Sequence, residues 1–387
     1  MTSMSKLIYQ RSFFSCIAVL LLGYITGLQL GRITPYAFRL TSEYGFSLPI
    51  IGWLTSLVTL FVAIFALPAS RLIPTFGLAR MVKVGAATVA TGAFLFIFAD
   101  TLTMMIVVRI VEATGHIITV ISAPSYIVAK APENLKAVFL ALWSSFVPIG
   151  FALSNTLGGT LQKQTDLQII WSYYAIAAVV VAIFVFLSLP NTPLEKPDSP
   201  NNLNKTSIAW ILVYSFGTYG FLSIGFFAFM PSFIKMTGPQ LLAPGVIPLF
   251  VPLGSFCAAF LFARASLALA SRTISVGFLI IAIASFFCFP LAASDASIYR
   301  ALFAFGCGIT AASIFTSVPD LTRSSMEATQ TIGAIAQAGG LMVLIGAPFA
   351  GFIIEMAGWQ TLGISFGFAA FSASIVAGAA ALTRKLE

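Results

Sequence analysis

Long apolar stretches alternate with short polar connections along the whole chain. Many of the stretches are about 20 residues long, which is the length that an α-helix needs to cross the hydrocarbon core of a bilayer. A transmembrane β-barrel would instead show short segments of alternating apolar and polar residues. The apolar stretches here are continuous, so they predict membrane-spanning helices. We place twelve spans at 12–37, 49–69, 80–99, 102–130, 136–161, 168–189, 207–233, 241–263, 273–293, 298–320, 325–353 and 361–382.

One polar connection is much longer than the others. It covers 190–206, near the middle of the chain, and it is rich in proline and polar residues. We interpret it as a cytoplasmic linker between two units. The predicted units are an N-terminal six-helix bundle at 1–189 and a C-terminal six-helix bundle at 207–387.

Landmarks of the first unit recur in the second at a nearly constant offset. Arg80 and Arg272 each begin an R-x4-G sequence at the start of a span, and 272 − 80 = 192. Arg109 and Arg300 each begin an R-x5-G sequence early in a span, and 300 − 109 = 191. A fixed offset is the signature of internal duplication. The predicted fold class is therefore an all-α membrane protein with twelve transmembrane helices in two pseudo-symmetric six-helix bundles.

Composition agrees with a membrane protein. Hydrophobic residues make up 59% of the 387 and charged residues only 8%, whereas soluble domains carry roughly 25% charged residues. The net charge of +8 is scattered over the connections between spans. We therefore expect the lipid bilayer, and no nucleic acid, as a partner.

Lysine and arginine are distributed unequally between the two sets of connections. With the N-terminus inside, 14 of the 20 fall on the cytoplasmic side and 4 on the outer side. Positive residues mark the cytoplasmic loops of membrane proteins. We expect a multi-pass protein of the cell inner membrane with both termini in the cytoplasm. The apolar run after 1–11 is longer than a signal-peptide core, so we expect it to be retained as the first helix.

The fourth span carries three ionisable side chains on one face. At about 100° per residue, Arg109, Glu112 and His116 fall within an arc about 60° wide. Ionisable groups inside a span cost about 2.5–3.5 kcal/mol each, so they are functional hypotheses by default. We interpret Glu112 and His116 as proton-coupling groups, and Arg109 as the partner of Glu112 or of a substrate anion. The structural alternative is an Arg109–Glu112 pair that fixes helix packing, with His116 merely hydrogen-bonded.

Two further arginines extend this interpretation. Arg32 lies late in the first span and Arg300 lies in the tenth. Together with Arg109 they would form a positive cavity that favours an anionic substrate. The alternative is that Arg32 and Arg300 extend to the outer headgroups. The remaining candidate substrate-binding residues, of which the aromatic ones could equally be packing residues, are Tyr24, Gln29, Trp143, Tyr219 and Gln337.

Other function classes lack their signatures in this sequence. The four cysteines fall inside apolar runs without metal-ligand spacing. No nucleophile–base motif indicates an enzyme, no filter-like run indicates a channel, and no P-loop indicates a pump driven by ATP. We therefore expect no enzymatic activity, no metal and no other cofactor.

Two segments resemble motifs of the major facilitator superfamily, a third matches poorly, and the resemblance covers essentially the whole chain. The sequence R-I-V-E-A-T-G at 109–115 is similar to the family's R-x-x-Q-G-x-G. The sequence G-F-A-L-S-N-T-L-G-G at 150–159 resembles the exporter-associated G-x3-G-P-x2-G-G, with Asn155 in place of the proline. The loop at 70–80 keeps Gly77 of the family's G-x3-D-R-x-G-R-R motif but lacks its aspartate.

The resemblance implies two bundles that rock about a central site lined by the first, fourth, seventh and tenth helices. The segments at 112–132 and 140–153 resemble the branch that contains cyanate- and nitroimidazole-type carriers. We expect a monomeric secondary active transporter that moves a small anionic organic molecule by alternating access, with proton coupling. Proton-driven efflux of drugs or metabolites is the alternative: the motif at 150–159 favours it, whereas Arg32 and the absence of a carboxylate in the first span oppose it.

Overall fold

The computed structural model describes residues 3–161, 166–190, 210–238, 240–261, 267–290 and 295–383, and nearly all of them are helical. The first half comprises α1 (Ser3–Gly31), α2 (Ala37–Tyr44), α3 (Leu48–Ser56), α4 (Leu60–Leu72), α5 (Leu78–Leu95), α6 (Leu102–Lys130), α7 (Lys136–Ser144), α8 (Phe146–Leu161) and α9 (Leu167–Ser188). The second half comprises α10 (Trp210–Thr237), α11 (Phe250–Leu261), α12 (Leu267–Phe287), α13 (Ser297–Leu321) and α14 (Ser325–Thr383). Short 3-10 turns are η1 (Thr34–Tyr36), η2 (Leu57–Thr59), η3 (Ile73–Phe76), η4 (Phe96–Phe98) and η6 (Ile247–Leu249).

The twelve predicted spans are all present as helical segments. Nine helical stretches of the described chain are long and apolar enough to cross a membrane, and α7 with α8, bent by 53°, forms a tenth. The long α14 supplies two spans because it is broken at Gly358, whose φ of 81° is open to glycine but costly for other residues. The shorter apolar helix Ile247–Phe260 completes the set. The predicted fold class is confirmed.

The first and fifth spans both differ from simple helices. The span at 136–161 bends between α7 and α8, because Pro148 has no N–H to donate to the carbonyl of Ser144 one turn earlier. The first span continues past Gly31 through η1 into the amphipathic helix α2. Of the predicted linker at 190–206, only Pro190 lies within the described residues, so the domain boundaries stay a prediction.

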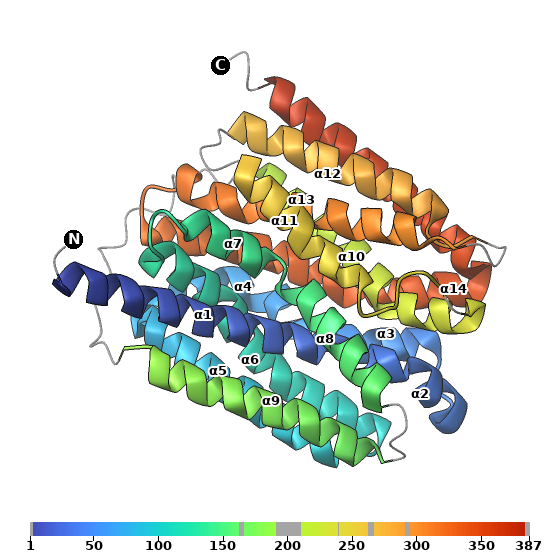
Figure 1. Cartoon of the computed structure of the whole chain (residues 1–387). Helices are drawn as coiled ribbons and strands as arrows, with labels where there is room; N and C mark the ends of the chain where they lie inside the picture. Colours follow the sequence, from blue (N-terminus) through green and yellow to red (C-terminus); the bar gives the residue numbers. More distant parts are fainter. Residues whose placement is uncertain are drawn as a thin grey trace.

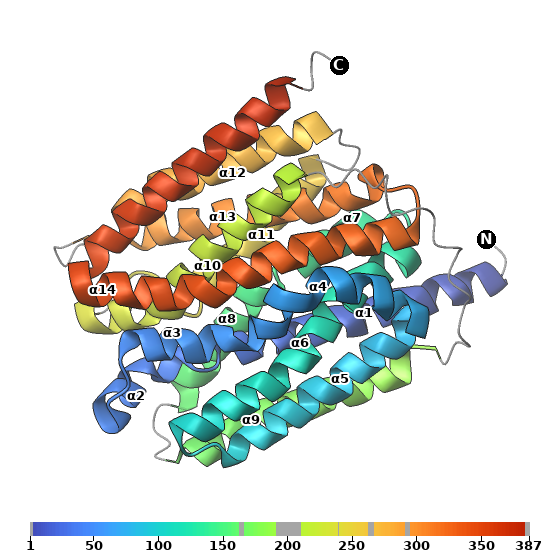
Figure 2. The same ribbon diagram turned by 180° about the vertical axis from the view of Figure 1, so that it is seen from behind.

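The two halves lie side by side, as Figure 1 shows, with the blue-to-green helices along one flank and the yellow-to-red helices along the other. The start of α1 and the end of α14 lie at one end of the helices, which we call the terminal end. The opposite end, where α2 and the break in α14 lie, is called the far end. Figure 2 shows α3 and α4 running beside α14 on the other side of the molecule.

The halves meet along two seams. In the first seam, α3 and α4 face α14. Here the Ser56 hydroxyl donates to the Leu344 carbonyl at 2.9 Å, and the Leu48 N–H donates to Glu355 Oε1 at 2.7 Å. In the second seam, α7 and α8 face α11, and the hydroxyls of Ser145 and Ser255 lie 2.8 Å apart.

Close helix packing inside the first half follows from small residues on α1. Gly23, Gly27 and Gly31 lie one turn apart and face α7 and α8, where an added Cβ at Gly27 would collide with the Phe146 backbone. On α8, a Cβ at Gly150 would collide with the backbone at Gly27. The two helices therefore touch through their backbones, as small residues spaced by four permit.

Candidate functional site

A buried cluster of charges lies inside the first half, where the end of α1 meets α6. Arg32 Nη2 donates to Glu112 Oε1 at 2.5 Å, and Arg109 Nη1 donates to Glu112 Oε2 at 3.1 Å. All three side chains are fully buried. One carboxylate is therefore shared by two guanidinium groups, and the cluster carries one excess positive charge.

Two neighbours position the charged groups. Gln29 Nε2 donates to Glu112 Oε1 at 3.1 Å and to the Val89 carbonyl at 3.0 Å, so α1, α5 and α6 are joined at one point. The Phe96 ring of η4 lies 3.5 Å from the Arg32 guanidinium carbon and 5.1 Å from that of Arg109. A cation over an aromatic face in a desolvated site is stabilised by about 2 kcal/mol or more. We call these groups, without Val89, the charge cluster.

Several donors of the charge cluster are unused. Within the described residues, Nε and Nη1 of Arg32 and Nε and Nη2 of Arg109 have no hydrogen-bond acceptor. A buried donor without a partner costs about 1–3 kcal/mol, and more when it is charged. The cluster is therefore suited to an additional anion or acceptor group.

A small cavity of about 60 Å³ lies between the two halves. Its walls are mainly aromatic and aliphatic, with a few neutral hydrogen-bonding groups. The Trp143 and Phe146 rings stack at 4.9 Å between centroids. Nδ1 of His116 and the Tyr219 hydroxyl have no partner within the described residues. We call it the central cavity, and its polar and aromatic lining includes Thr59, His116, Trp143, Ser144, Tyr219 and Ser223.

The α6 helix connects the charge cluster to the central cavity. Glu112 and His116 lie one turn apart on it, with Glu112 in the cluster and His116 in the cavity wall. The predicted polar face is thus divided between two neighbouring environments. Of the predicted substrate-binding residues, Trp143 and Tyr219 line the cavity, and Arg32, Arg109 and Gln29 lie in the cluster. Tyr24 is half-buried on α1 and is not among the residues that line the cavity.

Arg300 lies apart from the other two arginines. It is fully buried inside the second half, where Nε donates to the Cys288 carbonyl at 3.0 Å and Nη1 donates to Gln240 Oε1 at 3.1 Å. The structure therefore does not gather the three arginines in one positive cavity, because backbone and amide oxygens of the second half hold Arg300 in place. Nor does Arg32 or Arg300 extend to the surface, since both are fully buried.

Gln337 joins the two halves. Pro68 inside α4 has no N–H, so it leaves the Ile64 carbonyl without its usual helical donor. Nε2 of Gln337, from α14, donates to that carbonyl at 3.3 Å, and Oε1 accepts from the Leu67 N–H at 2.9 Å. Gln337 thus compensates for a proline in the opposite half and does not line the central cavity.

Phe96 is the member of the charge cluster that sequence reasoning missed. It lies at the end of the third span and is one of 37 phenylalanines in the chain. A weak signal existed, because buried cations in a membrane need a compensating neighbour. Nothing in the sequence distinguishes Phe96 from the phenylalanines that face lipid.

Comparison with known proteins places this architecture in a family. The model of the Major Facilitator Superfamily matches residues 15–342, and the chain therefore belongs to that superfamily. The arabinose-proton symporters of Escherichia coli strain K12 and of Escherichia coli O157:H7 are each 25% identical to it over 184 residues. That match covers 48% of this chain and 39% of each relative, so the chain spans about two fifths of their length.

A solved structure shares the fold. The human organic anion transporter MFSD10 (TETRAN) superposes with a TM-score of 0.70 at 14% sequence identity, covering 97% of this chain and 100% of that one. At this identity the likeness concerns the fold alone. Family and fold point to a multi-pass membrane transporter rather than an enzyme, and the predicted superfamily is confirmed. The predicted branch within it stays a prediction.

Proposed function

We propose that this protein is a proton-coupled secondary transporter that moves a small anionic organic molecule by alternating access. The observation that carries the proposal is the charge cluster, in which Arg32 and Arg109 share the single carboxylate of Glu112 one turn from the central cavity. We further propose that it acts as a monomer in the cell inner membrane, with cytoplasmic termini.

The charge balance of the cluster supports an anionic substrate. Two guanidinium groups and one carboxylate leave a buried excess of one positive charge, which is costly in a low-dielectric interior. A carboxylate or similar group would be attracted by this excess charge and would accept hydrogen bonds from both guanidinium groups, including the nitrogens that Glu112 leaves unused. The aromatic walls of the central cavity would accommodate the apolar part of such a molecule.

The same balance supports proton coupling. Glu112 occupies the donors that a substrate anion would use, so the two compete for Arg32 and Arg109. Protonation of Glu112 frees the guanidinium groups, and the bound anion then takes its place. The cluster has the same net charge when it is empty and ionised as when it holds one proton and one monoanion. Proton and anion thus strengthen each other's binding, as linkage requires, which favours symport over antiport.

His116 supports a proton route between the cluster and the central cavity. It lies one helical turn from Glu112, and its ring belongs to the cavity wall. Histidine is the side chain whose ordinary titration range lies nearest to neutral pH. We assign to His116 the transfer of a proton from the cavity toward Glu112.

The test is uptake and proton flux in proteoliposomes with an imposed pH gradient, screening small organic anions against lipophilic cations. We expect an inward proton gradient to drive anion accumulation. The Glu112→Gln variant should lose accumulation but keep anion counterflow, and Glu112→Asp should keep both because it retains a titratable carboxylate. Glu133→Gln is the matched control, because Glu133 is an exposed carboxylate paired with Lys136.

Two results would overturn the proposal. Accumulation that persists unchanged in a folded Glu112→Gln variant would remove this carboxylate from coupling. Movement of lipophilic cations against the proton gradient would replace anion symport with efflux antiport. The Glu112→Asp variant guards against misfolding, since it keeps the charge that the two arginines require.

A further inference from the structure

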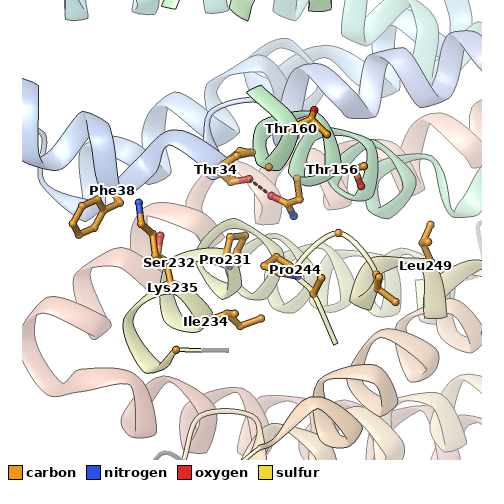
Figure 3. Close-up of a pocket in the computed structure, with 17 residues that line it drawn as sticks. Thr34, Phe38, Thr156, Thr160, Pro231, Ser232, Ile234, Lys235, Pro244 and Leu249 are labelled. Carbon is orange, nitrogen blue, oxygen red and sulfur yellow. Dashed lines mark hydrogen bonds between the residues drawn. The ribbon is translucent and has the colours of Figure 1, made fainter. Parts of the chain in front are cut away.

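A second and larger cavity lies between the halves at the far end. It measures about 750 Å³, and Figure 3 shows that η1, α2 and α8 of the first half face α10 and the turn before η6 of the second half across it. We call it the vestibule. The lining residues on which its chemistry depends are Thr34, Asn155, Thr156, Ser232, Lys235 and Pro244.

One cation sets the charge of the vestibule. Among the described residues that line it, Lys235 is the only charged side chain, and none carries a carboxylate. Its Nζ lies 4.1 Å from the centroid of the Phe38 ring, which holds the ammonium group at the cavity wall. The ring occupies one side of the ammonium group, which has three N–H donors. A single positive charge suits a monoanion.

Asn155 adds an independent sign of a missing ligand. Its side chain is more than nine-tenths buried and belongs to the vestibule wall, and its Nδ2 has no acceptor within the described residues. Its Oδ1 lies 3.5 Å from the Thr34 hydroxyl, the contact dashed in Figure 3. Buried amide donors are normally satisfied, and an exception in a cavity wall indicates an absent acceptor. This residue is also where the chain departs from the proline of the exporter-associated motif.

The vestibule is in line with the central cavity. Along α8, Val147 lines the central cavity and Asn155 lines the vestibule, with Phe151 between them. Along α10, Phe227 lies between cavity residues and vestibule residues in the same way. The fully buried rings of Phe151 and Phe227 lie 6.0 Å apart across the two halves. We call this pair of rings the Phe151–Phe227 barrier. At 1.5 Å per residue, the four-residue steps on α8 put it about 6 Å from each cavity along the helix.

We infer that the vestibule is a second binding site, which takes a small monocarboxylate with an apolar body and stages it outside the Phe151–Phe227 barrier. Lys235 pairs with the carboxylate, and the Asn155 Nδ2 donates to one of its oxygens. The proline-lined walls hold the apolar body, and the volume lies in the range of small-molecule sites. A cation is disfavoured by Lys235, and a dianion lacks a second positive group. That the staged anion is also the transported one rests on the proposed function.

The experiment is isothermal titration of the full chain in nanodiscs with three probes of one shape, namely benzoate, benzamide and benzylammonium. We expect benzoate to bind and to weaken with added salt, benzamide to bind about tenfold more weakly, and benzylammonium not to bind. One lost charge-assisted hydrogen bond corresponds to about that factor. Lys235→Gln should reduce benzoate binding about tenfold and remove its advantage over benzamide.

Two further variants locate the site. Asn155→Leu, which keeps the branched shape, should weaken benzoate and benzamide alike, because both present a carbonyl-type oxygen. Lys136→Gln is the matched control, since Lys136 pairs with Glu133 away from the vestibule, and it should leave binding unchanged. Benzoate binding that is insensitive to both Lys235→Gln and Asn155→Leu would overturn the inference, as would benzamide binding as tightly as benzoate.

The outcome is separable from that of the proposed function. Titration measures binding without transport, so vestibule binding that depends on Lys235 supports the site even if no proton-driven flux is found. Conversely, coupled anion flux that requires Glu112 but shows an unchanged apparent KM in Lys235→Gln would uphold the transporter and reject the staging site.

Discussion

Arg109 and Arg300 occupy corresponding positions in the two halves, yet their surroundings differ. Arg109 meets a carboxylate on its own helix, shares it with Arg32, and donates to the Gln29 carbonyl of α1. Arg300 meets a backbone carbonyl and an amide oxygen, and no carboxylate of the described chain lies within ion-pair distance of it. The two halves thus share the arginine but not its counterion. The comparison teaches that the charge cluster belongs to the first half alone, while the second half contributes neutral walls to the central cavity.

The largest effect is expected from removing the shared carboxylate without an isosteric replacement. Glu112→Ala leaves two buried guanidinium groups with no counterion, and breaking a buried pair costs about 3–5 kcal/mol. We expect a large loss of thermal stability in detergent. Adding Arg109→Met should recover part of it, because the excess charge returns to one. A double variant that is no more stable than Glu112→Ala would show that charge balance does not hold the first half together.

A smaller effect is expected from the corresponding change in the second half. Arg300→Gln removes hydrogen bonds to Cys288 and Gln240 but strands no carboxylate, so it should cost about 1–2 kcal/mol. Anion affinity in the proteoliposome assay should stay at the wild-type value. If a stable Arg300→Gln protein lost anion transport, the two arginines would share a role and the comparison would fail.

A variant at Gln337 tests the contact between the two halves rather than the stability of either half alone. Gln337→Leu keeps the volume but removes both hydrogen bonds to α4, leaving the Ile64 carbonyl unpaired at Pro68. We expect a loss of about 1 kcal/mol and a shift toward states in which the first seam is open. Spin-label distances between α4 and α14 at the terminal end should broaden, with Thr218→Val, which removes a bond inside α10 alone, as the control.

The smallest effect is expected from Asp295, in the connection that precedes α13. Asp295 accepts hydrogen bonds from the Ser297 N–H at 2.8 Å and from the Leu241 N–H at 2.7 Å, and bonds from the side chain and backbone of Ser297 lower its pKa below the ordinary 3.8. A carboxyl group whose pKa is lower in the folded state than in the unfolded state stabilises the protein at pH values above its unfolded pKa. This contribution is lost as the pH falls through its folded pKa. Asp295→Asn should therefore be slightly less stable at pH 6 than wild type, and melting curves should converge below about pH 4. A difference that grows on acidification would contradict this sign.

The hydrophobic pattern predicts the fold almost completely, because each span must satisfy its own backbone and must be about 20 residues long. It also places Arg109, Glu112 and His116 on one face, since that follows from helical geometry alone. It does not show that Arg32, just after the end of α1, pairs with Glu112 of α6, because this contact depends on how the two helices pack. The pattern likewise cannot show that Arg300 lies apart from the charge cluster. Nor can it show that Gln337 donates to the Ile64 carbonyl, which Pro68 leaves without its helical donor. These contacts arise from tertiary packing between segments far apart in sequence.

The backbone contact between Gly27 and Gly150 has a mechanical consequence. Because no side chains separate them, we expect α1 and α8 to tilt together as one lever. One arm of this lever forms a wall of the central cavity and the other a wall of the vestibule. A tilt that widens one compartment then narrows the other, so the two would fill and empty in alternation. A single label at the vestibule end of α8 would thus also report on the state of the central cavity.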